Sequence, residues 1–238
     1  MPAQNLAGDK PRRTLDAPLG KTIFFMHIPK TAGTSVRHSA ALYFGEDRAL
    51  KLYGNQGKTT SPTLKVLFHE AWAGFNDAHK FQLLSDYLIQ NEVPFFSSHK
   101  QLDLLPCFVP AQAFTILRDP VARVISHYHQ HLKKYDHLPL ETFIENPRFQ
   151  NVQCRHLNKT ALDQIGVVGL QDQYEETLRR VNWYFKIDLK ASKKNTATLI
   201  AKVKNRFLSS ALLQRIEQLN EKDMDLYEQA KKVFSDQS

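Results

Sequence analysis

The sequence predicts a single α/β domain in which a mostly parallel central sheet is flanked by helices. Apolar runs of strand length lie at 23–28, 93–96 and 113–117, and each run ends in a polar cluster. Strands that are buried on both faces of a parallel sheet have this nearly continuous apolar character. The chain has 238 residues and is 42% hydrophobic, so it is long enough for one sizeable core and short for two.

The first apolar run opens the stretch KTIFFMHIPKTAGTSV, from Lys21 to Val36. The run is too short for a helix and stops at Pro29, which cannot donate a hydrogen bond to a sheet. Apolar residues resume at helical spacing from Val36. This order predicts a strand, a short loop and a helix.

The loop between this strand and helix has the composition of an anion site. The first N–H groups of a helix and the positive end of its dipole attract phosphate-like groups. Gly33 permits close approach of the backbone, Thr34 and Ser35 can add hydroxyl donors, and Lys30 supplies a mobile charge. The alternative is an ordinary turn with a Thr or Ser cap and a surface lysine.

The segment 46–65 is polar and contains two glycines and a proline, which predicts a long loop of the kind that forms lids or acceptor-binding surfaces. Within it, GNQGKTT from Gly54 to Thr60 resembles part of a Walker A loop. That pattern needs glycine at the position of Leu52 and a buried strand before it. We therefore do not expect a phosphate loop here.

Residues 64–91 have apolar faces typical of one or two packing helices. The second apolar run, 93–96, leads to His99, and the third, 113–117, leads to Arg118. Because the carboxyl ends of parallel strands meet at one edge of a sheet, we expect these two side chains and the Lys30 loop to converge there.

A helix is expected directly after Arg118. Asp119 fits its cap, Pro120 its first position, and Ser126 points away from its apolar stripe. Arg118 and Ser126 could together hold one phosphate, the guanidinium through a bidentate contact. The alternative is that Arg118 forms an ordinary ion pair with Asp119 or another neighbour.

Two strings now resemble one known family. HIPKTAGTS is similar to the 5′-phosphosulfate loop, and LRDPVARVISHY to the 3′-phosphate motif, of sulfotransferases that use 3′-phosphoadenosine 5′-phosphosulfate (PAPS), particularly the family of heparan sulfate 2-O-sulfotransferase and its bacterial relatives. The resemblance implies a P-loop-like sulfotransferase fold with PAPS as co-substrate and no metal. It implies cofactor contacts from Lys30, Thr31, Ala32, Gly33, Thr34, Ser35, Arg118 and Ser126.

The resemblance also implies catalytic roles for His99 and Lys30. His99 would be the base that takes the acceptor's proton, since a neutral imidazole titrates in the useful range. Ser98 stands where relatives often have glycine, which is a departure from the family pattern. His127, His129 and His131 lack the carboxylate or cysteine partners of a metal site, so we expect packing and surface roles for them.

The likeness is diffuse in the rest of the chain. Asn151, Gln153 and Arg155 resemble a family element that either lines the cleft or simply starts a helix. The segment 167–178 resembles a strand entering a helix, and 219–234 resembles the family's closing helix. Lys193, Lys194 and Asn195 stand where relatives often place a loop near the nucleotide.

The composition sets limits on compartment and partners. The net charge of +8 and a pI near 9.4 indicate an anionic partner, which could be a nucleotide, an anionic glycan or nucleic acid. Cys107 and Cys154 cannot form a disulfide framework, and no apolar stretch approaches the length of a membrane span. We expect a soluble cytoplasmic protein with a flexible leader over 1–20 and one sulfotransferase domain over 21–238.

The expected activity is therefore transfer of a sulfuryl group from PAPS to an acceptor hydroxyl, on a carbohydrate or a small molecule, with no nucleic acid and no integral membrane contact. A P-loop-type nucleotide kinase is the nearest rival, with Asp119 in the role of a Walker B aspartate. A non-catalytic basic protein that binds polyanions is the alternative from another class. The acceptor and the oligomeric state are left open.

Overall fold

A computed structural model describes residues 22–54, 57–71, 77–99, 108–133, 138–157, 160–191 and 208–236. Its centre is a five-stranded sheet with the order β2-β3-β1-β4-β5. The strands are β1 (Ile23–Met26), β2 (Ala49–Leu52), β3 (Phe95–Ser98), β4 (Ala113–Leu117) and β5 (Val167–Leu170). All four neighbouring pairs are parallel, which confirms the predicted α/β class with a parallel central sheet.

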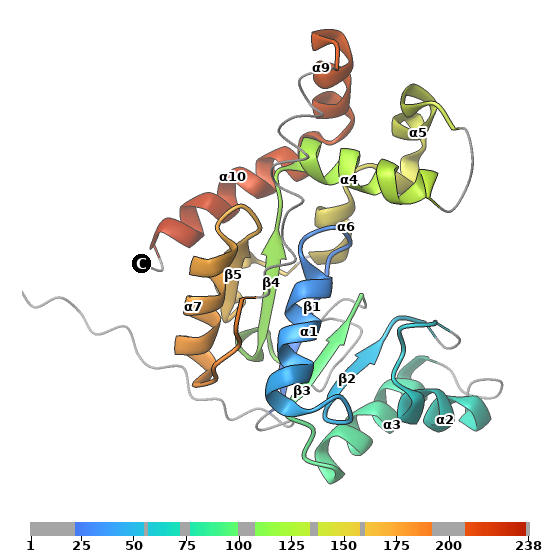
Figure 1. Cartoon of the computed structure of the whole chain (residues 1–238), viewed down its shortest axis with the longest axis vertical. Coiled ribbons are helices and arrows are strands. Elements are labelled where there is room, and N and C mark those ends of the chain that lie inside the picture. Colours follow the sequence, from blue (N-terminus) through green and yellow to red (C-terminus); the bar gives the residue numbers. More distant parts are fainter. Residues whose placement is uncertain are drawn as a thin grey trace, which may run out of the picture.

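Helices occupy most of the connections between these strands, and among the described residues three more helices follow β5 (Figure 1). The longer ones are α1 (Gly33–Phe44), α2 (Pro62–Ala71), α3 (Asp77–Gln90), α4 (Pro120–Leu132), α7 (Tyr174–Phe185), α9 (Ser210–Leu219) and α10 (Glu221–Asp236). Shorter helical segments are α5 (Leu140–Glu145), α6 (Val152–Leu157) and the 3₁₀ turns Pro110–Gln112, Pro147–Phe149 and Leu162–Gln164.

The predicted long loop at 46–65 is wrong in part, because it contains the edge strand β2 and the start of α2. The strand was hidden because Lys51 interrupts its short apolar run, and its side chain pairs with Glu46 at 2.7 Å. The chain then turns back on β2. The Ser61 N–H donates to the Lys51 carbonyl, and the Lys51 N–H donates to Ser61 Oγ.

Two apolar layers cover the two faces of the sheet. On one face, Phe24, Met26 and Phe96 pack with side chains from α2, α3 and α10. On the other face, Phe25 and Phe114 pack with side chains from α1 and α7. Alternate residues of β1 thus enter opposite layers, as a strand buried on both faces requires.

A third apolar cluster joins α4, α5 and α9. In Figure 1 these helices lie beyond the end of the sheet to which β4 points. Val121, Val124 and Ile125 supply the α4 side of this cluster, as the sequence spacing predicted. The helices therefore build one wall at the carboxyl edge of the sheet.

Several predicted features fall on residues that the structure does not describe. These are the 1–20 leader, Cys107, and the Lys193–Asn195 segment. Among the described residues, Cys154 is a free thiol. In the same part of the chain, no helix is both long enough and apolar enough to cross a bilayer.

Candidate functional site

The candidate site lies where the strand order changes direction. From central β1 the chain runs through α1 to β2 on one side, whereas from β4 it runs through α4, α5 and α6 to β5 on the other. In open parallel sheets, ligands bind in the crevice outside the carboxyl ends of the strands at such a point. The residues that follow β1 and β4 are therefore the first to consider.

The loop after β1 has an unusual backbone. Lys30 and Ala32 both adopt the left-handed conformation, with φ values of 75° and 70°. Non-glycine residues in this region cost on the order of 1 kcal/mol or more each, and such strain collects at ligand sites. Ala32 is the N-cap of α1 and provides no side-chain cap, so the Thr or Ser cap of the alternative interpretation is absent at this helix. The helix start therefore keeps N–H groups for an anion.

The hydroxyl groups of this loop have different surroundings. The buried Thr31 hydroxyl donates to the Ile28 carbonyl at 2.9 Å, so it fixes the loop instead of facing a ligand. Thr34 is exposed, and its hydroxyl accepts from Arg37 at 3.4 Å. Ser35 is buried in the first turn of α1. Of the three, only Thr34 presents an exposed side chain.

Gly33 is required by a neighbour that the sequence argument did not consider. A Cβ atom at this position would lie 1.8 Å from Nε2 of His27. The His27 imidazole thus fills the space above the first residue of α1, and the absence of a side chain at Gly33 lets the ring lie there. Close packing of His27 is the reason that the structure gives for this glycine.

Arg118 follows β4 and reaches the loop after β1. Its Nη1 donates to the Lys30 carbonyl at 3.1 Å, which brings the two predicted motifs into contact. Arg118 is only 6% exposed, yet its Nε has no hydrogen-bond partner among the described residues. A buried, unpaired donor on a charged group is costly, by about 1–3 kcal/mol. The guanidinium thus keeps a donor for which the described residues supply no acceptor.

Positive charges converge at this point. Burial, then the nearby charges of Arg118 and Lys133, lower the pKa of Lys30. Burial likewise lowers the pKa of Arg118, against the opposing effect of Asp119. Lys30, Arg118 and Lys133 therefore create a positive potential that favours an anionic ligand.

Gln153 explains how Arg118 is held. Its side-chain amide donates to the Arg118 carbonyl at 2.8 Å and accepts from the Arg118 N–H at 2.9 Å. Asn151, with φ at 47°, bonds instead to the Leu219 carbonyl and the Asn220 side chain at the start of α10. The side chains of Asn151 and Gln153 therefore support the site from behind.

Ser126 lies on α4, two turns after the helix begins at Pro120, and its side chain is half-buried. Asp119 caps this helix, since its carboxylate accepts from the Ala122 N–H at 2.7 Å. Both observations agree with the predicted cap and helix. The described contacts do not join Ser126 to Arg118, so its role remains a prediction.

His99 follows β3 and faces the loop after β1. Its Nδ1 donates to the His27 carbonyl at 2.5 Å, so Nε2 of the neutral ring carries the free lone pair. Burial is the main reason that the pKa of His99 is lowered to about 4, and the charges of His156 and Arg37 add to it. The imidazole is therefore neutral at pH 7 and presents an unprotonated nitrogen.

Three residues around His99 were missed by the sequence argument. The rings of His27 and Tyr53 each lie 4.5 Å from the His99 ring, and the His156 ring lies at 5.7 Å. His27 could have been noticed as a polar residue that ends an apolar strand. Tyr53 gave no signal because the strand before it was not recognised, and His156 lies on the short helix α6.

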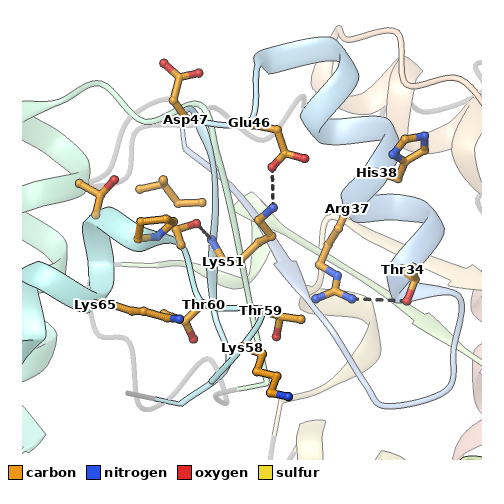
Figure 2. A pocket seen from close by; sticks show the side chains of 14 residues that line it. Thr34, Arg37, His38, Glu46, Asp47, Lys51, Lys58, Thr59, Thr60 and Lys65 are labelled. Atoms are coloured by element: carbon orange, nitrogen blue, oxygen red, sulfur yellow. Dashed lines mark hydrogen bonds and ion pairs between the residues drawn. The ribbon is translucent and has the colours of Figure 1, made fainter. Parts of the chain in front are cut away.

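A cleft of about 640 Å³ opens beside the cluster, between α1, β2 and the start of α2 (Figure 2). Arg37 and Thr34 form its α1 wall, and its other basic residues are His38, Lys51, Lys58 and Lys65. Two carboxylates, Glu46 and Asp47, also line it, and Glu46 pairs with Lys51. Most of the remaining lining comes from hydroxyl-bearing residues at 59–63. Much of the 46–65 segment thus surrounds a cavity whose charged residues are mainly basic.

Two features bear on the rival interpretations. Asp119 uses its carboxylate as a helix cap. In the Gly54–Thr60 segment, a Cβ on Gly57 would lie 2.3 Å from the Tyr53 carbonyl, so this glycine serves a tight turn. His127 and His131 pack against Phe143 and Phe149, in keeping with the packing role expected for them.

Comparison with known proteins adds no assignment. No protein-family model matches this chain, and no curated protein sequence matches it. The two motifs and the geometry of the residues around them are therefore the basis for assigning a function.

Proposed function

We propose that the protein is a sulfotransferase that moves a sulfuryl group from PAPS to an acceptor hydroxyl. The observation that carries the proposal is the contact of the two motif residues: Arg118 reaches the Lys30 carbonyl while its buried Nε lacks a partner among the described residues. A donor with two separate phosphate groups suits two adjacent cationic positions. The loop after β1 would hold the 5′-phosphosulfate, and Arg118, helped by Ser126, the 3′-phosphate.

The reaction would be an in-line displacement at sulfur. The acceptor oxygen forms a bond to sulfur as the bond between sulfur and the 5′-phosphate oxygen breaks, and the acceptor's proton passes to Nε2 of His99. Lys30 stabilises the charge that develops on the leaving phosphate. The free lone pair on Nε2 of His99, fixed by the Nδ1 hydrogen bond to His27, supports this role.

The low pKa of His99 fits a site that works with a bound anion. Without ligand, burial and neighbouring cations weaken this base. An anion at the Lys30 loop would raise the pKa of His99, because a nearby negative charge favours the protonated ring. His99 would thus become a better base once the anionic donor is in place.

The cleft between α1 and β2 is the proposed route of the acceptor. It is lined by hydroxyl and basic side chains and shares Arg37 with the surroundings of His99. Such a lining suits a polar, hydroxyl-bearing molecule, as expected for a carbohydrate. A screen of glycans, lipids and small alcohols with radiolabelled PAPS would identify the acceptor.

Calorimetry with adenosine 3′,5′-bisphosphate, without magnesium, tests the donor site. We expect binding to the wild type and a loss of about ten- to a hundredfold in affinity for Arg118→Ala, the scale of a hydrogen bond between charged groups. Affinity for adenosine 5′-phosphate, which lacks the 3′-phosphate, should change much less. Arg179→Ala, at an exposed position of α7, is the matched control and should bind like the wild type.

Three outcomes would count against the proposal. If Arg118→Ala lost affinity equally for adenosine 3′,5′-bisphosphate and for adenosine 5′-phosphate, Arg118 could not be assigned to the 3′-phosphate. Tighter binding of ATP with magnesium than of the bisphosphate would favour a nucleotide kinase. Binding that falls steeply with salt and ignores the 3′-phosphate would favour a polyanion-binding protein.

A further inference from the structure

Tyr53 lies beside His99, just after the edge strand β2. The ring centroids of Tyr53 and His99 are 4.5 Å apart with the rings at 73°, so the two meet edge to face. Tyr53 also meets the His27 ring at 5.5 Å and 78°. The tyrosine therefore covers the side of the histidine pair that would otherwise open toward β2.

The Tyr53 hydroxyl fixes the histidine that holds His99. It donates to Ser97 Oγ at 3.1 Å and lies 3.0 Å from Nδ1 of His27. Because its only hydrogen goes to Ser97, the hydroxyl accepts from His27 Nδ1. The His27 carbonyl in turn accepts from Nδ1 of His99. One chain of hydrogen bonds thus runs from β3 through Tyr53 and His27 to His99.

Contacts with α1 and with Thr60 fix the position of Tyr53. The Arg37 guanidinium lies 4.7 Å from the Tyr53 ring centroid, and Arg37 is anchored on α1 by its hydrogen bond to the Gly33 carbonyl at 3.1 Å. On the backbone side, the Tyr53 N–H donates to Thr60 Oγ1, which also donates to the Gly54 carbonyl. Thr60 therefore holds the Tyr53 backbone while Arg37, from the start of α1, holds the ring.

We infer that Tyr53, backed by Arg37, is a positioning residue that keeps His99 shielded from water and unprotonated, with Nε2 free to accept a proton. The inference rests on the proposed function for its catalytic meaning, but the shielding itself can be measured without any reaction. Among the described residues, the charged and titratable groups that face His99 are His27 after β1, Arg37 on α1, Tyr53 after β2 and His156 on α6.

The physical basis is the desolvation of His99. Burial lowers its pKa more than any neighbouring charge does, and Arg37 adds to the lowering. Removing the Tyr53 ring admits water to one side of the imidazole, so the pKa should rise toward the ordinary value near 6.5. Removing only the Tyr53 hydroxyl leaves the ring in place, so His99 should stay shielded from water.

The experiment is an NMR titration of the histidine ring protons from pH 8 to about 3.5 on the full chain without ligand, a range that spans the lowered pKa of His99. The His99 signal is assigned by its loss in His99→Gln. We expect His99 to stay largely unprotonated down to pH 5 in the wild type and in Tyr53→Phe. In Tyr53→Ala its midpoint should lie at least one pH unit above that of the wild type. Tyr43→Ala, an exposed tyrosine on α1, is the matched control.

Arg37→Gln provides a second measurement should Tyr53→Ala fail to fold. It removes both the contact that fixes the Tyr53 ring and a positive charge, so the His99 midpoint should rise here too. If Tyr53→Ala folds and its His99 midpoint equals that of the wild type, the inference is overturned. If Tyr53→Ala does not fold, an unchanged His99 midpoint in Arg37→Gln overturns it.

Activity then separates the two proposals. In an active enzyme, the acid limb of the kcat/KM profile should move with the midpoint in each variant. A shifted midpoint in a protein with no sulfuryl transfer would defeat the proposed function and leave the shielding of His99 standing. An active wild type whose variants keep the His99 midpoint would defeat the shielding alone.

Discussion

The His27 imidazole occupies the space that a side chain at position 33 would need. Its Nδ1 bonds to Tyr53 and its carbonyl accepts from His99, so this residue connects the first turn of α1 to the candidate base. A histidine that is fixed at three points cannot move aside cheaply. The loop after β1 and the candidate base His99 are therefore mechanically linked through His27.

A substitution of Gly33 tests this link at the residue scale. Gly33→Ala should lower the free energy of unfolding by about 1–3 kcal/mol, because the added methyl group overlaps the His27 ring. The cost of the same substitution should be smaller in a His27→Ala background, where the ring is absent. Urea unfolding of the four proteins of this double-mutant cycle gives the coupling, and purely additive costs would contradict the overlap.

At the scale of elements, a buried ion pair joins three helices behind the site. Arg123 of α4 lies 3.8 Å, from Nε to Oδ2, from Asp223 of α10, and both side chains are fully buried. The Asp223 carboxylate also accepts from the N–H groups of Gln153 and Cys154, at the start of α6. Burial lowers the pKa of Arg123 to about 10, so its guanidinium remains charged at pH 7.

Removing one partner of this pair should be costly. Asp223→Ala leaves the Arg123 charge buried and unpaired, so we expect a loss of about 3–5 kcal/mol in the free energy of unfolding. Asp225→Ala, on an exposed position of the same helix, should change it by about 0.5 kcal/mol or less. Urea unfolding measures both variants. A small effect of Asp223→Ala would show that the pair does not hold α10 in place.

The elements also show what the sequence could and could not predict. The apolar runs of β1, β3 and β4 were visible because central strands are buried on both faces. Edge strand β2 was not visible in the sequence, because its apolar run is short and is interrupted by the partly exposed Lys51. The convergence of Lys30 and Arg118 followed from parallel topology.

Other parts of the site could not be predicted because they depend on contacts between distant residues. Tyr53 approaches His99 only through the pairing of β2 with β3. Gln153 reaches Arg118 from 35 residues away in sequence, and Asp223 reaches the start of α6 from 70 away. Periodicity and local motifs report on residues that are close together in sequence. Contacts between residues that are distant in sequence therefore produce no recognisable sequence pattern.

At the scale of the whole molecule, buried histidines make stability depend on pH. Burial lowers the pKa of His27, His99, His127 and His156, to about 4 for His99. In the unfolded chain these rings take up a proton near pH 6.5. Between that pH and the lowered pKa, the unfolded state therefore binds more protons, and stability falls as the pH falls.

The contribution of His99 can be isolated. From pH 7 to pH 5 it should account for about 2 kcal/mol of lost stability, at about 1.4 kcal/mol for each pH unit below 6.5. The glutamine of His99→Gln does not titrate, so this variant should lose correspondingly less stability between pH 7 and pH 5. Urea unfolding of both proteins at the two pH values makes the comparison. An equal loss in both would mean that His99 takes up its proton as readily in the folded protein as in the unfolded chain.

The central place of β1 has a consequence for synthesis. This strand leaves the ribosome first of the five, yet its neighbours are β3 and β4, whose pairing partners for it begin at Phe95 and Ala113. The β3 partner begins about seventy residues after β1 ends and the β4 partner about ninety residues after it, so one edge of β1 is without its native partner until β4 has been translated. The loop after β1 thus acquires its shape late, and the nascent chain has to keep this apolar strand from aggregating in the meantime.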